Sequence, residues 1–202
     1  ILFEDINCDG EPDFYYAPNG VTVMCLLVAV GTSNQLNGVT YTKRDREGID
    51  ELVETQDWSA LETTCTTGIT SMNRLITYAT SFNQNIGSWD VSNVTNMSGS
   101  FDTCNCFNPS YSNVEDIPDL TYWDVSSVTD MSGMFSHIYG GAMFNQDISG
   151  WDVSNVTNMD GMFLGNQYFN QEYLKAKKTL KVFKKEDNFY YWFRVKTVSY
   201  TH

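Results

Sequence analysis

The chain has 202 residues, of which 42% are hydrophobic, so it is long enough to enclose one elongated core. Its formal net charge of -13 excludes nucleic acid and anionic membranes as expected partners for the body of the protein. The longest apolar run, residues 21–30, is too short to span a bilayer, so the sequence predicts no transmembrane segment.

The N-terminal segment, residues 1–18, is acidic and carries a candidate calcium loop. Oxygen-bearing side chains alternate around a glycine turn in the order D-x-N-x-D-G-x-x-D, which suits a hard cation such as Ca²⁺. Tyr16 stands where an EF-hand places its bidentate glutamate, so the loop is not an EF-hand. The alternative interpretation is an acidic surface turn in which Gly10 supplies a positive φ. The candidate metal ligands are Asp5, Asn7, Asp9 and Asp13.

Residues 19–65 predict an N-terminal cap made of strands and a helix. Two strand-like runs, residues 19–25 and 37–43, each begin with an Asn-Gly turn signal. Asp45 is a predicted helix N-cap, and the following residues place Ile49 and Leu52 on one apolar face. An array of repeats needs such a terminal unit, because its outer side must be polar.

Residues 66–171 contain an internal repeat. The text FNQNIGSWDVSNVTNMSGSF at residues 82–101 returns as FNQDISGWDVSNVTNMDGMF at residues 144–163. Residues 123–135, WDVSSVTDMSGMF, repeat the second half of this unit. Phe82 and Phe107 are about 25 residues apart, as are Phe144 and Phe169, whereas the middle unit is longer. A short, fixed period is typical of a solenoid, in which each unit buries its apolar face against its neighbours.

Two spacings within the unit predict its local structure. Trp89 and Val91 are two residues apart, as on one face of a strand, whereas Val94, Met97 and Phe101 have the spacing of one helix face. We therefore expect the α/β fold class: a leucine-rich-repeat-like solenoid of about 25-residue strand–turn–short-helix coils, with an N-terminal strand/helix cap. The expected structural core residues are Trp89, Trp123, Trp151, Met97, Met131 and Met159.

An aspartate follows the tryptophan of each unit, at Asp90, Asp124 and Asp152. We interpret these residues as turn formers that accept hydrogen bonds from the backbone near Ser92 and its equivalents, because an array repeats whatever holds each coil together. No catalytic motif places a Ser or Cys beside His137 or His202. The sequence therefore predicts a protein that is not an enzyme and has no catalytic residues.

The phrase WDVSNVTNM at residues 89–97 and 151–159, with WDVSSVTDM at residues 123–131, resembles the repeat of BspA-like leucine-rich-repeat surface proteins. The resemblance covers residues 66–171 and leaves out the last thirty residues. It implies a secreted or cell-surface protein that mediates adhesion, or binding to an extracellular protein or glycan. The alternative is a structural spacer or surface-layer segment without a specific ligand. Ligand choice is expected in side chains that vary between repeats, namely Asn85, Ser88, Asp147, Gly150 and the insertion at residues 108–122.

The same resemblance implies a disulfide. Capping segments of the related proteins often carry one cysteine in a strand like that of Cys25 and another at a position like that of Cys65. Such a bridge would stabilise the cap by about 3–4 kcal/mol. The alternative is that both are small buried apolar residues. The chain has five cysteines, so at least one has no partner within the chain in an oxidising compartment.

Residues 172–202 break the repeat pattern and are basic. They hold eight of the twelve lysine and arginine residues, and after Tyr173 only Glu186 and Asp187 are acidic. One interpretation is an amphipathic helical cap, because Ala176, Leu180 and Phe183 have helical spacing. A second is an unstructured segment unrelated to the repeats, such as the product of a shifted reading frame, and a third is a membrane-surface helix. We favour the second interpretation, because the repeat stops in mid-motif.

Overall fold

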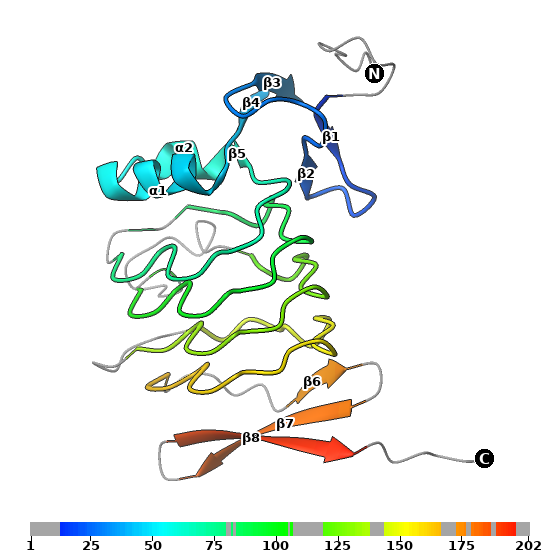
Figure 1. The fold of residues 1–202 in the computed structure, drawn as a ribbon, viewed down its shortest axis with the longest axis vertical. Coiled ribbons are helices and arrows are strands. Elements are labelled where there is room, and N and C mark those ends of the chain that lie inside the picture. Colours follow the sequence, from blue (N-terminus) through cyan, green and yellow to red (C-terminus); the bar gives the residue numbers. More distant parts are fainter. Residues whose placement is uncertain are drawn as a thin grey trace, which may run out of the picture.

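The computed structural model describes residues 13–79, 82, 84–104, 106, 119–137 and 144–166, and the backbone of residues 173–176, 179–186 and 189–196. Within this part of the chain, regular secondary structure is limited to small sheets and two short helices. The elements form an N-terminal cap, a stack of repeats, and a C-terminal sheet (Figure 1). Neither helix is long and apolar enough to cross a membrane.

The cap begins with two short antiparallel pairs. β1 (Tyr15–Tyr16) pairs with β2 (Val23–Met24), and β3 (Ser33–Leu36) pairs with β4 (Val39–Lys43). Asn37 and Gly38 connect β3 to β4 with φ values of 50° and 86°, the left-handed conformations that a tight hairpin turn requires. The turn predicted from this Asn-Gly pair is therefore confirmed.

Two helices follow the hairpin and lie over the first repeat, the coil of residues 66–79 that pairs with the unit beginning at Phe82. α1 (Arg46–Thr55) begins after Asp45, whose side chain accepts a hydrogen bond from Gly48 N, so the predicted N-cap is confirmed. α2 (Trp58–Glu62) leads into β5 (Thr64–Cys65), which pairs parallel to β4. The Arg46 guanidinium donates to the carbonyls of Ser71 and Asn73, so α1 satisfies acceptors at the edge of the first repeat.

Covalent and backbone contacts hold the cap against the repeats. Cys25 and Cys65 are joined by a disulfide with their Cα atoms 6.4 Å apart. Val23 N, in β2, donates to the Ser88 carbonyl of a repeat at 2.8 Å. Cys104 and Cys106 are both buried, and Cys8 lies outside the described residues.

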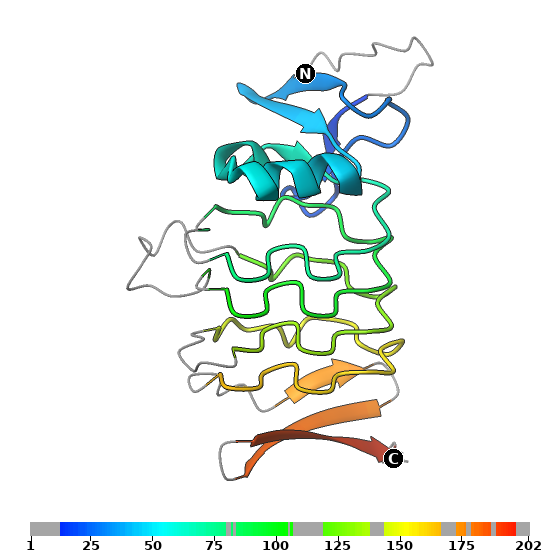
Figure 2. The ribbon, with the colours of Figure 1, turned by 60° about the vertical axis from the view of Figure 1, so that its left-hand side comes forward.

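Successive repeats lie one beside the next along the stack (Figures 1 and 2). Backbone hydrogen bonds join them. Isolated parallel bridges connect Ser71 to Asn96, Asn96 to Asp130, and Asp130 to Asn158. Around each bridge, alternate N–H groups donate to the next repeat, as Met97 N does to Asp130 O. The cap lies at one end of this stack.

The predicted fold class is wrong. The described repeat residues contain turns and isolated bridges in place of the strand and short helix expected of a leucine-rich-repeat-like α/β coil. The expected helix is interrupted by Gly99, Gly133 and Gly161, which have φ values of 62°, 61° and 63°. A left-handed residue at that point cannot continue a right-handed helix. The amides also bond between repeats, as Gly99 N does to Ser132 O, so they are not available for helical i→i−4 bonds.

The core of the stack is a column of aromatic side chains. Phe101, Phe135 and Phe163 stack with successive ring centroids 5.7 Å apart. All three recurrent tryptophans are buried, and each indole N–H donates to a backbone carbonyl of the preceding unit: Trp89 to Leu61, Trp123 to Ile86, and Trp151 to Leu120. Met97, Met131 and Met159 are buried in the same core.

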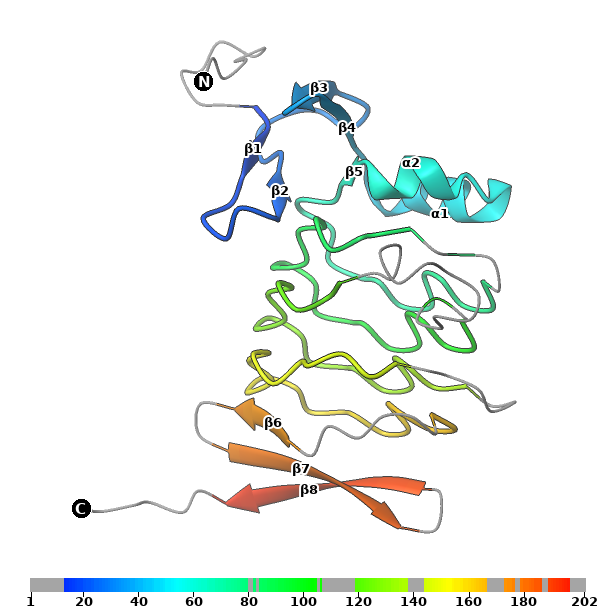
Figure 3. The same cartoon turned by 180° about the vertical axis from the view of Figure 1, so that it is seen from behind.

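The C-terminal segment forms an antiparallel sheet. It contains β6 (Tyr173–Ala176), β7 (Thr179–Glu186) and β8 (Phe189–Lys196), in that order in the sheet. The expectation of an unstructured tail therefore differs from the structure, and so does the alternative of a helical cap. This sheet lies at the end of the stack opposite α1 and α2 (Figures 1 and 3).

Candidate functional site

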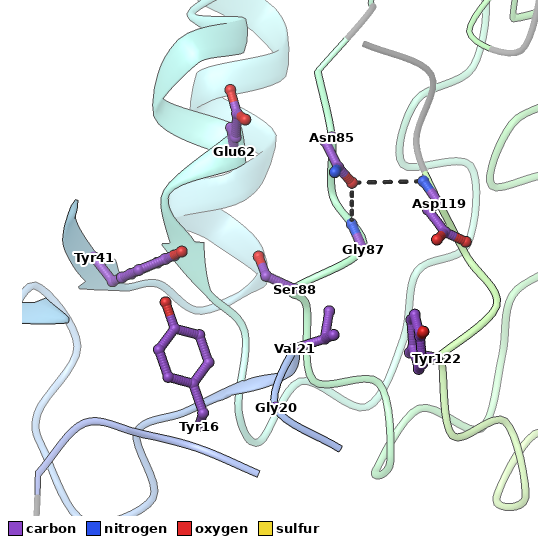
Figure 4. A pocket seen from close by; sticks show the side chains of 10 residues that line it. All are labelled: Tyr16, Gly20, Val21, Tyr41, Glu62, Asn85, Gly87, Ser88, Asp119 and Tyr122. Carbon is purple, nitrogen blue, oxygen red and sulfur yellow. Dashed lines mark hydrogen bonds between the residues drawn. The ribbon is translucent and has the colours of Figure 1, made fainter. Parts of the chain in front are cut away.

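A cavity of about 410 Å³ lies where the cap meets the repeats. Figure 4 shows that β1, β4 and α2 supply one side of it and that two repeat segments supply the other. The lining therefore comes from five stretches of chain that are distant in sequence. The residues are Tyr16, Gly20, Val21, Tyr41, Glu62, Asn85, Gly87, Ser88, Asp119 and Tyr122.

Two tyrosines form the cap side of this cavity. Tyr41 is buried in the small core around the disulfide, whereas Tyr16 is half-buried. Burial raises the pKa of Tyr41 well above its usual value, and a hydrogen bond with the Tyr16 side chain and the nearby Glu62 carboxylate raise this pKa further. The Tyr41 hydroxyl is therefore a neutral hydrogen-bonding group at physiological pH.

Asn85 holds the repeat side of the cavity in shape. Its Oδ1 accepts hydrogen bonds from Gly87 N at 2.9 Å and from Asp119 N at 3.5 Å (Figure 4). The backbone of Gly87 approaches the Asp119 carbonyl so closely that a Cβ atom at Gly87 would collide with it. This contact brings the end of the insertion, with Asp119 and Tyr122, to the repeat unit that begins at Phe82.

A second cavity, of about 300 Å³, adjoins the first at Tyr122. It lies between the hairpin loop that connects β1 to β2 and the start of a repeat. Asn19 shapes that loop, because its Oδ1 accepts from Val21 N and Thr22 N, both at 3.0 Å. The lining residues are Ala17, Pro18, Asn19, Thr22, Met24, Trp89, Asp90, Val91, Ser92, Tyr122 and Asp124.

The two cavities share one electrostatic character. Every charged side chain among the described lining residues is acidic: Glu62 and Asp119 in the first cavity, Asp90 and Asp124 in the second. The remaining lining is aromatic, aliphatic or neutral and polar. Together the cavities form an acidic and aromatic groove, which we call the cap–repeat groove.

The aspartate of each unit forms the predicted turn. Oδ1 of Asp90, Asp124 and Asp152 accepts a hydrogen bond from the backbone N–H two residues later, at distances of 3.1, 3.0 and 3.1 Å. Asp90 Oδ1 also accepts from the Ser92 hydroxyl at 2.7 Å. The interpretation of these residues as turn formers is confirmed.

Sequence reasoning identified only part of the cap–repeat groove. Asn85 and Ser88 line it, as do Asp119 and Tyr122 from the insertion, whereas Asp147 and Gly150 are not among its lining residues. Tyr16, Tyr41 and Glu62 were missed, because the repeat pattern does not extend into the cap. The pair of Asn-Gly turns was an available signal, since these turns fold the cap strands that carry both tyrosines.

The predicted calcium loop lies mostly outside the described residues, so its geometry is not part of the site. Asp5, Asn7 and Asp9 lie outside the described residues, and Asp13 is 2% exposed. Among the residues that are described, no three His, Cys, Asp or Glu side chains come together as a metal-binding group. His137 is buried and lies outside both cavities.

Comparison with known proteins places the chain in a family. Searches of curated proteins and of solved structures gave no match. A family profile described as "Mycoplasma protein of unknown function, DUF285" matches residues 50–135 and again residues 110–196. The two matches run from α1 through the repeats to the end of β8. The chain therefore belongs to the DUF285 family of Mycoplasma proteins of unknown function.

Proposed function

We propose that this protein is a non-catalytic binding domain of the cell surface or extracellular space, which binds a protein or glycan partner in the cap–repeat groove. The observation that carries the proposal is the first cavity, where three tyrosines surround hydrogen-bonding groups from five separate stretches of chain. Concave sites with aromatic walls and a few convergent polar groups are typical of ligand recognition. Tyrosine is favoured in such sites because it combines a large contact area with a polar end.

Two further observations support an extracellular location. The Cys25–Cys65 disulfide closes the cap onto the repeats, and such bonds persist mainly in oxidising compartments. The repeat phrase resembles that of BspA-like surface proteins, which mediate adhesion and partner binding. The disulfide also helps to fix the groove, because Cys65 is the last residue of β5 and the chain enters the first repeat directly after it.

A panel of immobilised glycans and extracellular proteins tests the proposal. The wild-type protein is compared with Tyr16→Ala and Tyr122→Ala, and with Tyr78→Ala as a matched control. Tyr78 is 58% exposed and lies outside both cavities. We expect binding that both groove variants weaken by about tenfold and the control leaves unchanged. Absence of any bound partner would favour a structural spacer, and equal binding by all three variants would exclude the groove.

A further inference from the structure

Asp90 differs from its equivalents in the other repeats because the cap covers it. Asp90 is 3% exposed, whereas Asp124 lies on the surface. In each residue Oδ1 forms the turn. At Asp124 the rest of the carboxylate is accessible to water, whereas Asp90 Oδ2 is buried and has no hydrogen-bond partner among the described residues.

A buried carboxylate oxygen without a donor is unfavourable. An unsatisfied buried acceptor costs about 1–3 kcal/mol, and more when it is charged. Asp90 lines the second cavity, and none of the described residues that line it is a lysine, arginine or histidine. A positively charged group in this cavity lies near the Asp90 carboxylate, whose charge is little screened because the side chain is buried, and is therefore attracted to it.

The other walls of the cavity fit a flexible aliphatic stem. Pro18, Met24 and Val91 are apolar, and Tyr122 presents an aromatic side chain that is 49% exposed. Alkyl chains pack on such surfaces while their charged end reaches a carboxylate. An ammonium or guanidinium group also interacts favourably with tyrosine rings.

The first cavity offers a second position of the same character. Glu62 and Asp119 line this cavity together with Tyr16 and Tyr41, and Tyr122 lines both cavities. A chain with basic side chains at two positions can therefore occupy both. Sulfated or uronic glycans carry the wrong charge for these walls, and neutral glycans do not compensate the charge of Asp90.

We propose that the cap–repeat groove binds a basic peptide segment of a partner protein, with one lysine or arginine side chain directed to Asp90 in the second cavity. This inference rests on the proposed function and specifies its partner class. A protein with lysine or arginine in an extended, accessible segment satisfies the requirement. The acidic net charge of -13 adds long-range attraction to such a segment.

The test uses an acetylated peptide in which lysine alternates with glycine, and the same peptide with every lysine acetylated. The second peptide keeps the aliphatic stems and loses the charge. Binding to the full chain is measured by calorimetry at physiological salt. We expect the lysine peptide to bind at least tenfold more tightly than its acetylated counterpart.

Three single-charge variants locate the binding site. Asp90→Asn keeps the turn acceptor and replaces Oδ2 with an N–H donor, so we expect about a tenfold loss of affinity. Glu62→Gln should lose about threefold, since this carboxylate is exposed to solvent. Asp152→Asn makes the same change at an equivalent turn outside both cavities and should bind like the wild type.

The outcomes separate the alternatives. Equal losses in all three variants would show nonspecific attraction to the acidic protein and overturn the inference. Equal binding of both peptides, or no binding of either, would also overturn it. If the peptides fail while a glycan from the panel binds and Tyr16→Ala weakens it, the proposed function stands and the basic-peptide inference falls. Thermal melts of each variant confirm that a lost affinity does not reflect unfolding.

Discussion

At the scale of single residues, the recurrent tryptophan combines apolar burial with a fixed hydrogen bond. Trp123 is 3% exposed, and its indole N–H donates to the Ile86 carbonyl at 3.2 Å. We expect Trp123→Ala to lower the free energy of unfolding by about 3–5 kcal/mol, since it leaves a cavity in a packed core. Trp123→Phe keeps much of the apolar contact and should cost less. Denaturant unfolding measures both, and a loss below about 1 kcal/mol for alanine would contradict this account of the core.

Tyr41 gives the stability of the protein a dependence on alkaline pH. An unfolded tyrosine has a pKa of about 10, and burial raises the pKa of Tyr41 above that value in the folded state. Above pH 10 the folded chain therefore holds more protons than the unfolded chain. The free energy of unfolding should then fall as pH rises, by up to about 1.4 kcal/mol per pH unit from this group. Melts across alkaline pH should show a shallower fall for Tyr41→Phe, and parallel profiles would contradict the prediction.

Calcium binding at the N-terminal loop stays a prediction of the sequence. Asp5, Asn7, Asp9 and Asp13 supply oxygens in a pattern typical of the weak sites of extracellular modules, with a Kd of roughly 10⁻⁴–10⁻³ M. Calorimetry with calcium chloride compares the wild-type protein with Asp9→Ala. We expect binding heat only for the wild type, and identical titrations would remove the site.

Within each repeat, the same spacing of apolar residues is compatible with a helix and with a series of turns. Val94, Met97 and Phe101 are all buried, as their spacing predicts, yet they lie in successive turns and not on a helix. The spacing of apolar residues indicates which side chains face the core, but it does not indicate which carbonyl groups accept hydrogen bonds from the backbone amides. The glycine that follows each methionine by two residues was the signal against a helix. By contrast, Asp45 and the Asn37-Gly38 pair act through their own local chemistry, so their elements could be predicted.

The turns of the repeat therefore depend on glycines with a left-handed backbone conformation. Gly133 has a φ of 61°, and its neighbours leave ordinary contact distance for a Cβ atom. Gly133→Ala should cost about 1–2 kcal/mol, because the backbone conformation is unfavourable for alanine. Gly150→Ala is the matched control, since a Cβ there meets nothing within 4 Å and the φ is not left-handed. Equal melting of the two variants would show that φ at Gly133 does not constrain the repeat.

At the scale of the whole molecule, the candidate site is formed by docking of the cap onto the repeats. Internal repetition predicted a stack, and within it Asn85 and Ser88 as variable positions. It could not predict Tyr16 or Tyr41, because their approach depends on long-range contacts such as Val23 N to Ser88 O. Periodicity describes neighbouring repeats, whereas a groove between two different units depends on how those units pack.

At each end of the stack, the outermost repeat has backbone N–H or C=O groups that need hydrogen-bond partners from another segment. At the first end, Arg46 donates to carbonyls of the first repeat. Between repeats, Met131 N and Gly133 N donate to Asn158 O and Asp160 O. The equivalent amides of the last repeat belong to Met159 and Gly161, and they require acceptors from a segment beyond it.

The strands β6, β7 and β8 lie at that end of the stack, and the family match includes them. A chain ending at Gln171 should therefore melt at a lower temperature, with a broader transition, because removing an end unit exposes the apolar face of the last repeat. Calorimetry and light scattering compare it with the full chain. The favoured interpretation of the sequence makes the opposite prediction, that truncation preserves cooperative melting and increases solubility. A sharp, unshifted transition in the shortened chain would show that β6–β8 contribute nothing to the fold, and the open amides of the last repeat would then be satisfied by water.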